Sequence, residues 1–70
     1  MGFKINIIVN GLNEEVPDDS TIATLIKLFN ELDENLIVEH NGNYIFKDEY
    51  DKIPITENDT LEFINPVIGG

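Results

Sequence analysis

Two Asn-Gly dipeptides, at positions 10–11 and 41–42, limit the possible folds of this chain more than any other feature. A type I′ turn needs positive φ at both central residues, and Asn-Gly adopts that conformation at low cost. Residues 3–9 alternate in character with period two before the first dipeptide, and residues 12–16 follow it as a polar, Glu-bearing stretch. Each dipeptide therefore predicts a β-hairpin, the first one having an edge strand that ends at Pro17.

A single helical pattern separates the two hairpins. Ser20 is the expected N-cap, and two aspartates precede it near the positive end of the helix dipole. The apolar residues that follow lie on one face at helical spacing: Ile22, Leu25, Ile26, Phe29 and Leu32. We expect residues 33–35 to close this helix and its apolar stripe to pack on a sheet.

The second half of the chain reads as three more strands. These are residues 36–40, 43–46 and 60–65, with a polar turn at 47–52, a core-filling loop at 53–55 and a turn at 57–59. In the last strand Leu61 and Phe63 should face inward, and Glu62 and Ile64 outward. The order β-β-α-β-β-β predicts a two-layer α+β domain over residues 1–66, with the helix across one sheet face. A last strand lying parallel beside the first would make the sheet mixed, with a right-handed crossover.

Composition excludes several functional classes. Four lysines and no arginine stand against fourteen acidic residues, for a formal net charge of −10, so nucleic acid and anionic membranes are poor partners. There is no cysteine, and hence no disulfide or thiolate-metal site. No apolar run is long enough to span a bilayer and the N-terminal residues contain no signal-peptide core, so we expect a cytoplasmic protein.

The last four residues are the main functional candidate. Val67 and Ile68 are followed by Gly69 and Gly70, a pair without side chains that can thread into a narrow channel of a partner. We interpret residues 67–70 as a flexible tail on the domain. The competing interpretation is an ordinary frayed chain end.

Other candidate residues have simpler explanations beside the functional ones. Ile8 and Ile64 should both point away from the helix, and we expect them to be neighbours in a partner-docking patch; the alternative is ordinary exposed apolar surface. His40 is expected to end a strand at the rim of the core rather than to bind metal. Asp48, Glu49 and Asp51 fit a solvated loop, and no metal or cofactor motif is present.

Five short motifs in this order resemble the ubiquitin-like (β-grasp) sulfur carriers. They are Val-Asn-Gly at 9–11, Pro-Asp at 17–18, Val-Glu-His-Asn-Gly at 38–42, Glu-Asn-Asp at 57–59 and the terminal Gly-Gly. The resemblance is closest to the ThiS family of thiamine biosynthesis, in which the second hairpin typically reads Val-Glu-Leu-Asn-Gly; His40 replaces that Leu. The tail, Pro-Val-Ile-Gly-Gly, is more similar to that of MoaD, the small subunit of molybdopterin synthase.

The resemblance implies a chemistry and a set of partners. A ThiF-like, E1-like adenylyltransferase would use ATP to adenylate the Gly70 carboxylate, and a sulfur donor would convert it to a thiocarboxylate. A ThiG-like thiazole synthase, or the large subunit of molybdopterin synthase, would then take the sulfur. The chain would then be a co-substrate and not an enzyme. From the pattern of the chain itself we expect no bound cofactor or metal, and docking through Ile8, Ile64, Val67 and Ile68. The alternative is a ubiquitin-like modifier or binding module.

Overall fold

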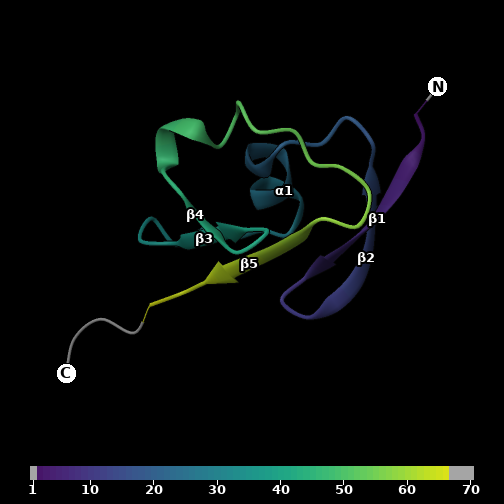
Figure 1. The fold of residues 1–70 in the computed structure, drawn as a ribbon. Coiled ribbons are helices and arrows are strands. Elements are labelled where there is room, and N and C mark those ends of the chain that lie inside the picture. Colours follow the sequence, from purple (N-terminus) through teal and green to yellow (C-terminus); the bar gives the residue numbers. More distant parts are fainter. Residues whose placement is uncertain (1, 67–70) are drawn as a thin grey trace.

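A computed structural model describes residues 2–66 as a five-stranded sheet with one α-helix on one side of it (Figure 1). The elements are β1 (Lys4–Val9), β2 (Leu12–Pro17), α1 (Ile22–Leu28), β3 (Ile37–His40), β4 (Asn43–Ile45), the 3₁₀ turn η1 (Lys47–Glu49) and β5 (Thr60–Ile64). The strand order is β2-β1-β5-β3-β4. Because β1 and β5 are parallel and the other neighbours antiparallel, the sheet is mixed, and the predicted α+β arrangement is confirmed.

Both predicted hairpin turns are confirmed. Asn10 and Gly11 have φ of 51° and 81°, and Asn41 and Gly42 have φ of 50° and 84°. These are left-handed conformations, which glycine and asparagine tolerate and most other residues avoid. The local sequence therefore determines where the chain reverses.

The helix begins one residue later than the sequence predicted, so the expected N-cap is wrong. Thr21 is the N-cap: its hydroxyl accepts a hydrogen bond from the Thr24 backbone N–H at 3.2 Å, and the Thr24 hydroxyl accepts one from the Thr21 N–H at 2.8 Å. This reciprocal pair is a capping box. The Ser20 side chain is buried and donates instead to the Pro17 carbonyl at 2.7 Å.

The helix also ends earlier than predicted. Its last residue is Leu28, and Asn30 adopts a left-handed conformation with φ of 59°. The Glu31 N–H donates to the Ile26 carbonyl at 2.9 Å, which closes the helix end in a Schellman motif. Leu32, which the sequence placed on the buried stripe, is therefore beyond the helix and 81% exposed.

The core lies between α1 and the face of the sheet that it covers. It is formed by Ile7, Val9, Val16, Ile22, Leu25, Val38, Ile45, Ile55, Leu61 and Phe63. The inward orientation of Leu61 and Phe63 and the core-filling role of Ile55 are confirmed. The Ile55 N–H donates to the Ser20 carbonyl at 3.0 Å, which holds the 53–55 loop against the start of the helix. The opposite face of the sheet has no layer over it within residues 2–66.

Within the described residues, neither α1 nor η1 has the length and apolar content that crossing a bilayer requires.

Candidate functional site at the end of β5 and on the uncovered sheet face

The strand that leads to the predicted functional tail is β5, at the centre of the sheet (Figure 1). Residues 67–70, which include all four tail candidates, lie outside the described residues. The last described positions are Asn65 and Pro66, and the Asn65 side-chain amide donates to Glu31 at 3.3 Å. The geometry of the site is therefore that of the base from which the tail departs.

Two turn asparagines hold β5 in place. The Asn10 side-chain oxygen accepts a hydrogen bond from the Phe63 N–H at 2.8 Å. The Asn41 side-chain oxygen accepts one from the Thr60 N–H, also at 2.8 Å. Sequence analysis assigned these asparagines to turns only, although both could also accept from a neighbouring strand. Because β5 is bonded to β1, to β3 and to both hairpin turns, it is a rigid base for the residues that follow.

Ile8 and Ile64 share the uncovered face but are not neighbours, so that part of the prediction is wrong. Both are partly exposed, at 38% and 37%. In the parallel register Ile8 is opposite Thr60, whereas Ile64 is opposite Ile37 of β3. Ile64 is four residues further along β5 than Thr60, about 13 Å at strand spacing. Ile8 and Ile64 are therefore two separate apolar side chains on the uncovered face and do not form one patch.

Acidic and aromatic side chains of β5, β3 and β4 lie on the same uncovered face. The register places Glu62 of β5 opposite Glu39 of β3, and Glu39 opposite Tyr44 of β4. Ile8, Thr60 and both glutamates line a hollow of about 290 Å³ on this face. Like charges directly opposite each other destabilise a sheet, and within the described residues no lysine pairs with either glutamate. The face is therefore complementary to a partner that carries positive charge.

Within residues 2–66, the one close contact between a basic and an acidic side chain joins the second hairpin to the loop before β5. His40 is half-buried at the end of β3, as predicted, and its Nε2 donates to Asp59 at 2.8 Å. Asp59 also accepts from the Thr56 N–H, the Thr56 hydroxyl and the Asn41 amide at 2.9, 3.0 and 3.1 Å. Burial alone would raise the pKa of Asp59, but these hydrogen bonds, with His40 first, lower the pKa from 3.8 to about 2.

The hydrogen bonds of this network hold the second hairpin against the loop before β5. Within the described residues no three His, Asp or Glu side chains are grouped closely enough to hold a metal ion. The role of Asp59 was missed in the sequence because Glu57-Asn58-Asp59 reads simply as a turn. Its position three residues after Thr56 is the one available signal, since such spacing allows an Asp to accept from the backbone of a tight turn.

The Asp59→Asn substitution should reduce stability at neutral pH, because an amide cannot accept from all four donors. The folded pKa lies below the unfolded value, so the carboxylate stabilises the fold fully above pH 4 and loses this contribution toward pH 2. We expect the free energy of unfolding of the variant to be about 2 kcal/mol lower than that of the wild type at pH 7. Urea unfolding at about pH 7 and about pH 2.5 measures the difference in the free energy of unfolding between the wild type and the variant, and this difference should be smaller at the lower pH. An equal difference at both pH values would contradict this role.

The fold and the site together define a class of protein. A mixed sheet has its first and last strands parallel at the centre, one helix covers one face, and Gly69 and Gly70 follow the central last strand in the sequence. This is the ubiquitin-like β-grasp architecture of the sulfur carriers.

Comparison with known proteins identifies the family. The sequence model of the ThiS family matches residues 4–70, and the chain therefore belongs to the ThiS family of β-grasp sulfur carriers. One similar solved structure is the thiamine biosynthesis protein ThiS from Geobacter metallireducens, with a TM-score of 0.83 and 23% sequence identity. That match covers 94% of this chain and 100% of the other, and it confirms the β-grasp fold. A comparison with the curated proteins finds no match.

Proposed function

We propose that this chain carries sulfur on the carboxylate of Gly70 and serves as a co-substrate of partner enzymes. The observation that supports this most is the ThiS family match, which extends through Gly69 and Gly70 to the last residue. The rigid attachment of β5 fits the same role, because a fixed base limits the positions that a short tail can reach.

The proposed chemistry replaces one carboxylate oxygen with sulfur. The Gly70 carboxylate attacks the α-phosphate of ATP in the active site of a ThiF-like adenylyltransferase, pyrophosphate leaves, and an acyl-adenylate forms. A sulfur donor, such as a persulfide with a thiol to reduce the resulting acyl disulfide, displaces AMP and leaves a thiocarboxylate. The sulfur is then a better nucleophile than the oxygen it replaced. The partners supply ATP binding and catalysis, and the carrier itself binds no cofactor.

The product that receives the sulfur is proposed to be the thiazole of thiamine, made by a ThiG-like thiazole synthase. Family membership and the structural likeness to a thiamine biosynthesis protein support this assignment. The MoaD-like sequence of residues 66–70 favours a second candidate, the large subunit of molybdopterin synthase, with the same chemistry at Gly70. In both cases Ile8 and Ile64 are the proposed docking residues on the domain, with Val67 and Ile68 in the tail.

Intact-mass measurement tests the proposal. The chain, incubated with its adenylyltransferase, ATP and a sulfur donor, should gain the mass difference between one sulfur and one oxygen, and the gain should require ATP. The sulfur-bearing chain is then incubated separately with thiazole synthase and with the molybdopterin synthase large subunit, each with its other substrates. Only one of the two enzymes should return the mass of the chain to its starting value. Attachment of the intact chain to lysines of other proteins, without a sulfur-bearing species, would instead support a modifier.

A further inference from the structure

A second concave surface lies beside the end of β5 and is separate from the hollow on the uncovered face. It is a pocket of about 430 Å³, within the range of volumes that hold ligand-sized groups. Its apolar lining comes from Leu36 and Ile37 at the start of β3, Tyr44 on β4 and Tyr50 after η1. Tyr44 is 55% exposed.

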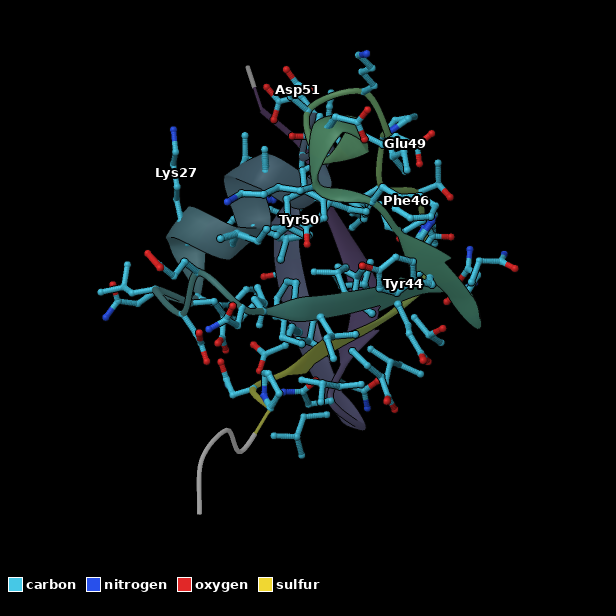
Figure 2. The ribbon with its side chains drawn as sticks, turned by 90° about the vertical axis from the view of Figure 1, so that its left-hand side faces the viewer. Lys27, Tyr44, Phe46, Glu49, Tyr50 and Asp51 are labelled. Atoms are coloured by element: carbon cyan, nitrogen blue, oxygen red, sulfur yellow. The ribbon has the colours of Figure 1, made fainter. Side chains whose placement is uncertain are left out.

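The aromatic part of this pocket is formed by Tyr44 and Tyr50. Phe46 packs edge-on against Tyr44, with ring centroids 4.9 Å apart and an interplanar angle of 86°. Tyr50 is half-buried and packs against the core. Burial, and secondarily the neighbouring Tyr44, raise the pKa of Tyr50, so its hydroxyl stays neutral. In Figure 2 Tyr44 projects from β4, and Tyr50 lies between β4 and α1. The pocket therefore presents two aromatic rings, one exposed and one half-buried.

The rim of the pocket is acidic. Glu31, Asp33 and Glu34 line it from the loop after α1, and Lys47 is the one cationic side chain in the lining. Within the described residues none of these carboxylates forms an ion pair with a lysine. An apolar, aromatic floor beneath carboxylates that have no cationic partner among the described residues is complementary to a cation with a flat or apolar body.

The pocket is also close to the place where the tail departs. Ile37, in its lining, is the register partner of Ile64 at the end of β5. Gly70 is four residues beyond Pro66, so covalent geometry keeps its carboxyl group within about 14 Å of Pro66. A partner that binds this carboxyl group must therefore come close to the end of β5, where Ile37 of the pocket lining is the register partner of Ile64.

We propose that this pocket binds an arginine side chain of the adenylating partner, an inference that rests on the proposed function. The guanidinium plane stacks on Tyr44 beside Tyr50, its edge donates to Glu31 and Glu34, and its methylene stem lies along Leu36 and Ile37. Arginine fits better than lysine because the guanidinium both stacks on aromatic rings and donates in pairs to carboxylates. The arginine would orient the domain while the partner receives Gly70.

A second copy of this chain is a poor occupant of the pocket. The sequence contains no arginine, and two chains that each carry a net charge of −10 repel each other. A basic segment of another protein carries the positive charge that complements the acidic rim of the pocket.

A small probe tests the pocket without any enzyme. The ¹⁵N-labelled chain is titrated at low salt with N-acetyl-arginine amide, and with N-acetyl-lysine amide for comparison. The largest amide shifts should occur at Leu36, Ile37, Tyr44 and Tyr50, and they should be larger with the arginine probe. Shifts that are absent, or that follow the acidic surface generally, would overturn the proposal.

Adenylation kinetics test the pocket in the complete reaction. The double variant Glu31→Gln/Glu34→Gln should raise the KM for the carrier about fivefold to tenfold with kcat unchanged, because the lost contacts are made outside the reacting group. The control Glu49→Gln/Asp51→Asn removes the same charge around η1, outside the pocket lining (Figure 2). We expect less than about a twofold change for the control.

The outcomes separate the two proposals. Equal KM values for the two double variants would mean that only overall charge matters, which would overturn the arginine pocket and leave the carrier function standing. A wild-type chain that the enzyme does not adenylate would overturn the proposed function and the pocket proposal with it. Circular dichroism should show the same fold for both variants, since all four positions are on the surface or its rim.

Discussion

Deleting Gly69 and Gly70 is expected to abolish adenylation while leaving the domain folded. The new terminal carboxylate, on Ile68, would stop two residues short, about 7 Å from the required position in an extended chain. It would also carry a β-branched side chain where the native terminus has none. Misplacement of a reacting group by far less than this costs about 100-fold in rate. ATP–pyrophosphate exchange catalysed by the partner should therefore fall by at least about that factor.

The Gly70→Ala substitution is the matched control for the deletion. It keeps the carboxylate at the same chain length and adds one methyl group. It therefore tests whether the last residue must lack a side chain, separately from whether the chain must have its full length. We expect an intermediate loss. The deletion should unfold at the same urea concentration as the wild type, because all core residues lie between Ile7 and Phe63. A truncated chain that still supported exchange at the wild-type rate would contradict a function at Gly70.

Local features of the fold could be predicted from the sequence because local chemistry determines them. Asn-Gly fixes the two turns through positive φ, and alternation with period two fixes which side chains of a strand share a face. The helix ends were harder to predict. The apolar spacing continues to Leu32 although Asn30 ends the helix, and Ser20 and Thr21 are both acceptable caps until burial removes Ser20.

Contacts between distant segments could not be predicted. Alternation places Ile8 and Ile64 on one face, but the offset between two parallel strands is set elsewhere. Here the Asn58 N–H donates to the Asn6 carbonyl at 2.8 Å and the Ile8 N–H to the Asp59 carbonyl at 2.9 Å, which fixes the register. No pattern within either strand carries that information.

The candidate site likewise has one part that the sequence predicts and another that only the fold shows. The terminal glycines are visible in the sequence because their significance is chemical and local. The arrangement around the base of the tail depends on the fold, because residues from separate loops and strands meet there. The asparagine contacts to β5 and the pocket between Tyr44 and Tyr50 therefore required a structure.

Replacing Ile8 and Ile64 with aspartate should weaken binding to the adenylating partner, and the two substitutions should act independently of each other. Each substitution removes an exposed apolar contact, and we expect each to raise the dissociation constant about tenfold. Because the two positions are separated by more than about 10 Å, their free-energy effects should add, so the double variant should bind about 100-fold more weakly. Titration calorimetry with the wild type, both single variants and the double variant measures this directly.

The Asn13→Asp substitution controls for charge. Asn13 is exposed and is the register partner of Ile8 on β2, so the variant adds one negative charge beside that position without removing apolar surface. We expect less than about a threefold change. A basic partner gains attraction from added aspartates, so weaker binding by the isoleucine variants would measure lost apolar contact and not charge. Unchanged affinity in the double variant would remove both residues from the interface, and a double variant no weaker than either single one would show that they act as one contact despite their separation.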